Sequence, residues 1–292
     1  MGDGLGISPG ERTRVYEQTL AAEYLRWMRA WIDAHPEAGF AAKRVTGTED
    51  APGGVFAGPR DAVVTDCFGL GYGERVTDAL FDEIEGVFEA QDSIPEVECT
   101  PYSDGSLLWQ LERRGYGVRN YLQIFWRDLG SAPEERVEGV EVRRVDKSDP
   151  TDVALAVRTI AAGMESTDGQ PSEPGRVMAE QVVSCVENAT FLAFVDGEVT
   201  GGSSAGVWER HPMSGPHANL YGGSTLPSAR GKGVQRALML ERLRWAYAEG
   251  ARTVSLDCKP MIASERNARR LGFELACTKG VFVKDPELGG RG

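Results

Sequence analysis

The sequence lacks several features that would each identify a class of protein. It contains no apolar run near the ~18 residues that a membrane-spanning helix requires, and residues 1–8 show no basic stretch followed by an apolar one, as a secretory signal would. Lysine and arginine total 32 against 44 aspartates and glutamates, so a clustered basic surface for nucleic acid is not expected. We therefore expect a cytoplasmic protein that binds neither membranes nor nucleic acid.

Cysteine is scarce, and its spacing excludes two further classes of protein. The five cysteines are an odd number and form no Cys-x-x-Cys pair, which argues against a disulfide framework and against a structural metal site. Most of them lie in apolar stretches, which is typical of buried free thiols in a reducing compartment. They are Cys67, Cys99, Cys185, Cys258 and Cys277.

What the chain does have is an excess of acid, with a net charge of −12 over 292 residues. The length fits two domains or one large one. An acidic surface attracts amines, so the charge is compatible with a small cationic substrate. Solubility alone is the other explanation for the same charge.

A weak internal repeat organises the chain. Residues 97–101 (VECTP) and 256–260 (LDCKP) share the order apolar, acid, cysteine, any residue, proline, which is typical of a short strand that ends at proline. A helical segment with basic residues near its end follows each of them. An apolar strand then closes each copy, ending FWRD at residue 128 and FVKD at residue 285. The offset is 159 at the cysteines and 157 at the later landmarks.

We interpret the repeat as two copies of one fold, with a linker between residues 130 and 137. The expected domains are residues 1–130 and 137–286, followed by a flexible tail at 287–292. Strands and helices alternate, so the expected class is α/β with a mixed sheet. In the second half we expect strands at 140–145, 191–195, 199–208, 219–226 and 253–258, helices at 153–164, 177–186, 233–248 and 264–271, and a final hairpin.

The first copy lacks the first strand and helix of the second. It opens instead with an amphipathic helix that carries aromatic residues at spacings of three and four, ending in Trp27 and Trp31. Such a stripe is typical of core or inter-domain packing. A second amphipathic helix is expected across residues 76–87.

One segment carries a recognisable chemistry. A strand ends at Leu226, the turn Arg230-Gly231-Lys232-Gly233 follows, and a helix begins at once. Glycine allows left-handed backbone and close approach to a ligand, and the first N–H groups of a helix have no partners inside it. Together they form a phosphate site, although a Gly-x-Gly turn can also be an ordinary tight turn. Neither the Walker pattern nor the dinucleotide-binding fingerprint is present.

The segment 226–234 (LPSARGKGV) resembles the cofactor-binding motif of the GCN5-related N-acetyltransferases. Arg230 and Gly233 match that motif, whereas Gln235 stands where the family has a small residue, so its side chain must turn away from the pyrophosphate. Residues 264–273 (SERNARRLGF) resemble the later helix of the family that flanks the cofactor, and the element order agrees across residues 137–285. The first half resembles the same fold in degenerate form, as in tandem members.

The resemblance implies acetyl-CoA as acyl donor and assigns roles to residues of this chain. Backbone groups at the strand end would bind the pantetheine arm, and amides of residues 231–236 would hold the pyrophosphate. Asn267 would contact the cofactor from the later helix, or be a solvated helix residue without that role. The expected cofactor-binding residues are Ser224, Thr225, Leu226, Arg230, Gly231, Lys232, Gly233, Val234, Gln235, Arg236 and Asn267.

The catalytic residues are less well defined by the sequence. Many members of the family place an acidic tyrosine four residues before the glycine that ends the later helix, and here that position is Ala268. Ser264 is a weak substitute. His217, Glu209 and His211 lie near strands that could border an acceptor cleft, and His217 has a suitable pKa for a base. The alternatives are that a water chain removes the proton, and that His217 is an ordinary loop residue without a catalytic role.

The first half has a different loop at the equivalent place. Gly69, Gly71 and Gly73 keep the flexibility, but no basic residue lies between Cys67 and Glu74. We interpret this half as a structural partner that shapes the acceptor cleft. The alternative is a second, weak cofactor site.

The predicted function is an acetyl-CoA-dependent N-acetyltransferase that acts on a small-molecule amine. The alternatives are a non-catalytic acyl-CoA-binding regulatory or interaction protein, and an acetyltransferase for a protein or peptide amine. A monomer or a homodimer is expected, with no metal.

Overall fold

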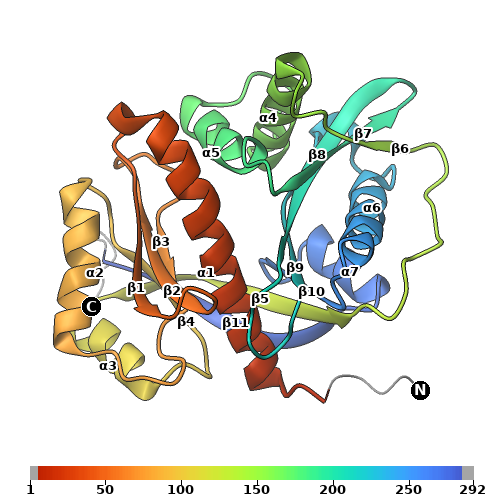
Figure 1. The fold of residues 1–292 in the computed structure, drawn as a ribbon. Coiled ribbons are helices and arrows are strands. Elements are labelled where there is room, and N and C mark those ends of the chain that lie inside the picture. Colours follow the sequence, from red (N-terminus) through yellow and green to blue (C-terminus); the bar gives the residue numbers. More distant parts are fainter. Residues whose placement is uncertain (1–5, 285–292) are drawn as a thin grey trace.

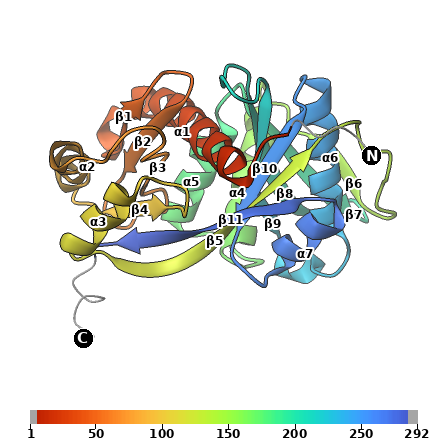
Figure 2. The same ribbon diagram turned by 90° about the horizontal axis from the view of Figure 1, so that it is seen from below.

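The computed structural model describes residues 6–284 and has a mixed α/β fold, as expected (Figures 1 and 2). Eight strands form one sheet in the order β4-β11-β5-β10-β9-β8-β7-β6, and three more form a small sheet, β1-β2-β3. The expected tail at 287–292 and the repeat landmark Asp285 lie outside the described residues. None of the helices in this part of the chain has the length and hydropathy to cross a membrane.

The second half follows the expected order closely. Its turn at Asp196-Gly197 has positive φ at both residues, 52° and 81°, and joins the paired residues Val195 and Glu198, as a two-residue hairpin of this type requires. The elements are β6 (Glu141–Arg144), α4 (Pro150–Met164), α5 (Glu173–Val183), β7 (Ala189–Val195), β8 (Glu198–Trp208), β9 (His217–Thr225), α6 (Val234–Ala248), β10 (Thr253–Cys258), α7 (Ala263–Arg270) and β11 (Glu274–Val283).

The first half contains three strands that the sequence did not indicate. They form the small sheet, where β1 and β2 pair antiparallel, and none of them shows an alternation of apolar and polar residues. The tryptophan stripe of the first helix is buried, as expected: Trp27 is 1% exposed. The elements are α1 (Pro9–Ala34), β1 (Ala41–Gly47), β2 (Pro52–Ala57), β3 (Asp66–Phe68), α2 (Asp78–Ala90), β4 (Glu96–Cys99), α3 (Gly105–Arg113) and β5 (Gly117–Asp128).

The two halves exchange their last strands, and the final hairpin predicted from the sequence is therefore wrong. Strand β11 is continuous and lies between β4 and β5, while β5 lies between β11 and β10 (Figure 2). Each long strand finds partners in the other half, so neither needs to fold back on itself. Leu122 pairs with Lys279, and these residues are related by the repeat offset of 157. A pseudo-twofold axis therefore passes through this pair.

A buried ion cluster lies on that axis. The Lys279 ammonium is 0% exposed and lies 3.1 Å from Glu17 and 3.4 Å from Asp257, with Glu98 as a third partner. Burial opposes the charge, but the carboxylates of Glu17 and Glu98 outweigh it and raise the pKa of Lys279 well above its usual range. The cluster joins α1, β4, β10 and β11, and it ties the two halves together.

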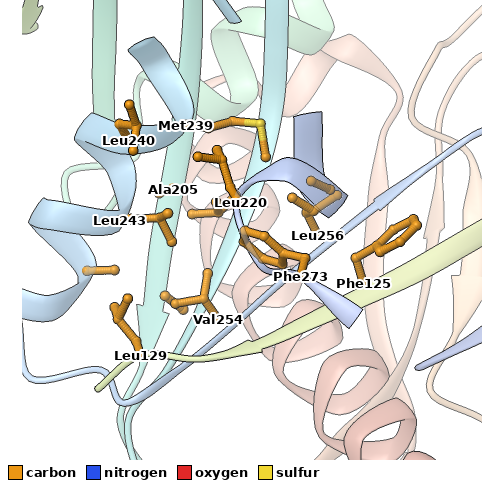
Figure 3. Packing of buried hydrophobic residues seen from close by; sticks show 14 of the residues in the cluster. Phe125, Leu129, Ala205, Leu220, Met239, Leu240, Leu243, Val254, Leu256 and Phe273 are labelled. Atoms are coloured by element: carbon orange, nitrogen blue, oxygen red, sulfur yellow. The ribbon is translucent and has the colours of Figure 1, made fainter. Parts of the chain in front are cut away.

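The large sheet is covered on both faces in the second half. Successive residues of β8 point to opposite faces: a Cβ at Gly201 would meet Val234 of α6, and one at Gly202 would meet Ile160 of α4. On the α6 side, Leu220, Met239 and Phe273 pack in one core cluster (Figure 3). On the other side lie α4 and α5, together with α1 from the first half (Figure 1).

Candidate active site

The central feature of the site is a separation of two parallel strands. Strands β9 and β10 pair only where residues 217–219 face residues 253–255, so they diverge towards their carboxyl ends. Beyond the last pair, β9 has a bulge, because Gly222 and Gly223 together oppose Ser203 on β8, and Gly222 has φ of 62°. Open α/β sheets bind ligands at such carboxyl ends.

The loop that follows β9 presents a set of free backbone donors. Gly231 and Gly233 have φ of 84° and 81°, and Gly233 is the N-cap of α6 without any capping side chain. Within the described residues, the N–H groups of Gly231, Gly233, Val234, Gln235 and Arg236 donate to no protein acceptor. Donors at the positive end of a helix dipole favour an anion.

Three cationic side chains lie beside these donors. Arg230 is exposed and donates to Ser166 at 2.8 Å. Arg236 pairs with Glu135, whereas Lys232 is exposed and makes no ion pair with any described residue. The loop can therefore supply counter-charge to a phosphate group from at least two sides.

The structure brings three predicted side chains together at the start of α6. Gln235 Nε2 donates to Ser264 Oγ at 2.6 Å, and Asn267 Nδ2 donates to Gln235 Oε1 at 2.8 Å. The Gln235 side chain thus turns towards α7. Ser264 and Asn267 anchor α7 beside the loop.

His217 is buried on β9, whereas we expected it to border an acceptor cleft or to be an ordinary loop residue. It is 0% exposed, its ring nitrogens lie 2.8 Å from Thr253 Oγ1 and 2.7 Å from Ser255 Oγ, and it stacks on Trp126. Burial lowers the pKa of His217 to about 3. It also lies where β9 and β10 are still paired. This geometry argues against a general-base role for His217.

His211 is buried as well, and Glu209 is not. The His211 ring lies 3.2 Å from Gln18 Oε1, and burial lowers the pKa of His211 to about 4. Glu209 lines a cavity of about 610 Å³ between α1 and the end of β8. That cavity lies beyond Ala205, where the pairing of β8 with β7 stops. Its volume is in the range of small-ligand pockets.

Sequence reasoning missed two polar residues at the bulge. Glu23 of α1 is 0% exposed, and neither of its oxygens has a hydrogen-bond partner among the described residues; the same holds for the Tyr221 hydroxyl. A Cβ at Gly206 would stand 2.6 Å from Tyr221 Oη and 2.7 Å from Glu23 Oε2. Glu23 falls on the apolar stripe, between Leu20 and Trp27, and a carboxylate at that spacing was the available signal.

In the glycine-rich loop of the first half, backbone groups are hydrogen-bonded to other parts of the protein. Gly69 N–H donates to Glu17 Oε2 at 3.2 Å, and Asp104 N–H donates to Gly71 O at 2.8 Å. The helix that follows, α2, has a side-chain cap, because Thr77 Oγ1 accepts from Leu80 N–H. Donors that are free in the Arg230 loop are here partly satisfied inside the fold.

Comparisons with known proteins agree with this geometry. A family model described as "Acetyltransferase (GNAT) family" matches residues 163–273. The aminoglycoside N(6')-acetyltransferase type 1 of Salmonella typhimurium is 30% identical over 112 residues, which are 36% of this chain and 76% of that protein.

Two solved structures share the fold over most of the chain. A GCN5-related N-acetyltransferase from Kribbella flavida has a TM-score of 0.60 at 16% identity, covering 92% of this chain and 95% of its own. A tandem GNAT protein from the clavulanic acid biosynthesis pathway has a TM-score of 0.54 at 14% identity, covering 84% and 82%. At these identities the likeness concerns the fold.

Proposed function

The chain belongs to the GNAT family and is an N-acetyltransferase, which transfers an acyl group to an amine, and on this basis we propose that acetyl-CoA is its donor and a small-molecule amine its acceptor. The cofactor would lie between the diverging ends of β9 and β10. The observation that carries this proposal is the set of free N–H groups on residues 231 and 233–236 at the start of α6.

The parts of the cofactor would meet different parts of the site. Its pyrophosphate would accept hydrogen bonds from those amides, with Arg230 and Lys232 as counter-charges. Its pantetheine arm would pair with the backbone of residues 224–226, beyond the bulge. Asn267 would reach the arm from α7. Free N–H groups near the bulge would stabilise the oxyanion that develops on the thioester carbonyl.

A small molecule is the acceptor that the volume of the cavity between α1 and β8 favours. Its lining carries four carboxylates and four guanidinium groups, together with Trp208 and Trp245: Glu49, Glu187, Glu209 and Glu249, and Arg26, Arg29, Arg44 and Arg210. Carboxylates pair with ammonium groups, and aromatic faces attract cations. The relative that carries the name aminoglycoside acetyltransferase makes a polyamine sugar a reasonable first acceptor to test.

The division of the chain into two domains, residues 1–130 and 137–286, remains our proposal. In this division, the last strand of each half lies beside strands of the other half.

The test is the release of free CoA thiol from acetyl-CoA in the presence of kanamycin, spermidine or a lysine-containing peptide. We expect release above the amine-free rate with at least one of the two small amines. Release with the peptide alone would show that the acceptor is a protein or peptide amine and not a small molecule. Acetyl-CoA should also raise the melting temperature by mass action. Stabilisation without any CoA release would favour a non-catalytic acyl-CoA-binding protein.

A further inference from the structure

Helix α1 of the first half lies across the site of the second half. It packs on β8 and β9 on the face opposite α6 (Figure 1). Its Thr19 Oγ1 accepts from Asn219 Nδ2 at 3.0 Å, and Asn219 Oδ1 accepts from Ser255 Oγ at 2.7 Å. Asn219 and Ser255 are the last paired residues of β9 and β10. Thr19 therefore contacts the sheet at the point where these strands begin to separate.

The next turn of α1 places Glu23 beside the bulge. Its carboxylate is fully buried and has no hydrogen-bond donor among the described residues. Tyr221, which directly precedes the two bulged glycines, turns an unpaired hydroxyl into the same space, as the distances from a Cβ at Gly206 show. Buried polar groups are normally paired, so two unpaired ones that lie against the same glycine, Gly206, point to a polar partner that the described residues do not supply.

The same carboxylate lies behind the wall of the 610 Å³ cavity. Ala22 and Arg26, which flank Glu23 on α1, line that cavity, as do Val207 and Trp208, which follow Gly206 on β8. Glu23 and Gly206 are therefore next to residues of the cavity wall in the chain, and both adjoin Tyr221 at the bulge. An amine that enters from the cavity would reach Glu23 before it reached a thioester held at the bulge.

We propose that Glu23 is the general base of the acetyl transfer, supplied by the first half to the active site of the second. The assignment rests on the proposed function and extends it to a residue outside the segment that matches the family model. It also gives the first half a chemical role. Gly206, which has no side chain, leaves the space that the Glu23 carboxylate and the Tyr221 hydroxyl occupy.

The step balances without any further reactant. The acceptor ammonium gives one proton to Glu23, and the neutral nitrogen attacks the thioester carbonyl carbon. A C–N bond forms and the C–S bond breaks, with its electron pair leaving on sulfur. The second proton lost by the nitrogen goes to that sulfur, so the products are the amide, CoA thiol and protonated Glu23, which releases its proton to solvent.

The charges around Glu23 fit this role. Burial raises the pKa of Glu23 to about 8, and the Arg26 guanidinium and the nearby Asn219 side-chain amide partly oppose that rise. Tyr221 faces it from β9, and Cys185, at the end of α5, faces Tyr221. A base of this pKa takes a proton readily near neutral pH. Activity should rise with pH up to about 8, because the carboxylate must be ionised to act.

The decisive experiment compares Glu23→Gln with Glu17→Gln in the full chain. Both are buried carboxylates on α1, but Glu17 pairs with Lys279, whereas Glu23 makes no ion pair or hydrogen bond within residues 6–284. The kcat for the best acceptor should fall by about 10²- to 10⁴-fold in Glu23→Gln, and its rise with pH should disappear. In Glu17→Gln the pH profile should keep its shape.

Thermal unfolding provides a second readout. A carboxyl whose pKa is raised in the folded state makes the fold less stable as pH rises from about 4.5 to 8. Glu23→Gln should therefore raise the Tm at pH 8 and change it little at pH 5, whereas Glu17→Gln should lower the Tm. Gly206→Ala, whose methyl group would displace the Glu23 carboxylate and the Tyr221 hydroxyl without changing any charge, should also reduce kcat/KM.

The outcomes separate this proposal from the proposed function. If the wild type acetylates an amine and Glu23→Gln does so at the same rate and with the same pH profile, Glu23 is not the base. If folded wild type releases no CoA with any of the amines, the proposed function falls, and this assignment falls with it. Slow turnover with an unchanged pH profile would show that Glu23 only positions other groups.

Discussion

The two glycine-rich loops occupy equivalent places in the repeat and have opposite chemistry. In the first half, residues 69–74 contain no basic residue, and the carboxylate of Glu17 accepts from Gly69 N–H. In the second half, the loop from Arg230 to Gly233 leaves its amides free and adds cationic side chains. Glycine content alone therefore does not identify a phosphate site.

What surrounds each loop decides its use. In the first half, α3 packs against the start of α2: Ser106 Oγ accepts from Val76 N–H at 2.8 Å, and Gln110 donates to Asp78 at 2.6 Å. In the second half, the side-chain hydrogen bonds between α7 and the start of α6 all involve Gln235, within the part of the chain that the structure describes. The same repeat thus gives one helix start that the protein covers and one that remains open to a ligand.

The largest effect should come from breaking the ion cluster that both halves share. Lys279→Met would leave Glu17 and Glu98 buried without a counter-charge, next to the half-buried Asp257. Loss of one partner of a buried pair costs about 3–5 kcal/mol, so urea unfolding at pH 7.5 should show a loss of that order. Because the carboxylates can take up protons at lower pH, the loss should shrink at pH 5.5.

That prediction treats the halves as one unit, and a separate unfolding transition for each half would contradict it. We expect the halves to unfold together because β5 and β11 are exchanged, so that each half alone would lack an inner strand of the sheet. Glu98→Gln, which leaves Glu17 and Asp257 to neutralise the ammonium, serves as a milder control.

The second largest effect concerns cofactor affinity. Gly231→Asp would put a carboxylate where a phosphate must approach, and one or two charge-assisted bonds of roughly 1.5–3 kcal/mol each would be lost. Acetyl-CoA binding should weaken by about ten- to several hundred-fold, as measured by calorimetric titration. A Cβ at Gly231 meets nothing within 4 Å, so Gly231→Ala is a control for backbone strain alone.

Desulfo-CoA extends the test, because it keeps the pyrophosphate and lacks the thiol. Both ligands should lose affinity equally for Gly231→Asp. Affinity close to that of the wild type in a folded variant would place the pyrophosphate elsewhere. A drop in Tm with no selective loss of binding would show that Gly231 only allows a tight turn and does not contribute to cofactor binding.

Much of this architecture was predictable from local patterns, and the exceptions have a common cause. Strand β10 begins and ends where the sequence predicted, and α6 begins one residue later, because a Pro, a Gly and apolar periodicity mark those boundaries. The position of β11 in the sheet was not predictable, since the strands that it pairs with lie more than a hundred residues away in sequence. Long-range pairing leaves no local signal.

The candidate site divides in the same way. The loop from Arg230 to Gly233 is contiguous, so one stretch of sequence reveals it. Glu23 and Tyr221 come together only through the packing of α1 on β9, and His217 was misjudged because a histidine near two prolines gives no sign of burial. Its hydroxyl partners lie on another strand, at Thr253 and Ser255.

A smaller effect should follow from the glycines of the first loop. Gly71 and Gly73 have φ of 74° and 94°, and a Cβ would stand 2.8 Å from Asp104 N at Gly71 but no closer than 3.8 Å to any atom at Gly73. Left-handed backbone costs a residue with a Cβ about 1–2 kcal/mol. Each alanine variant should therefore be less stable in urea, Gly71→Ala more so.

Neither alanine variant should change the affinity for acetyl-CoA by more than about twofold, in contrast to Gly231→Asp. The measurement is the same titration, carried out well below the Tm of each variant. A large loss of affinity with the fold intact would revive a second cofactor site in the first half.

The smallest effect should come from reversing one charge in the first loop. Glu74 Oε1 accepts from Gly47 N–H at 3.3 Å, an exposed bond of little energetic weight. Glu74→Lys gives this loop a cation without opening its donors, because Glu17 still holds Gly69 N–H. We expect stability within about 0.5 kcal/mol of the wild type and no new binding of acetyl-CoA at low ionic strength, where a surface charge acts most strongly. A second binding event in the titration of this variant would show that charge alone separates the two loops. A single event with unchanged affinity would show that free backbone donors are required first, and that counter-charge only adds to them.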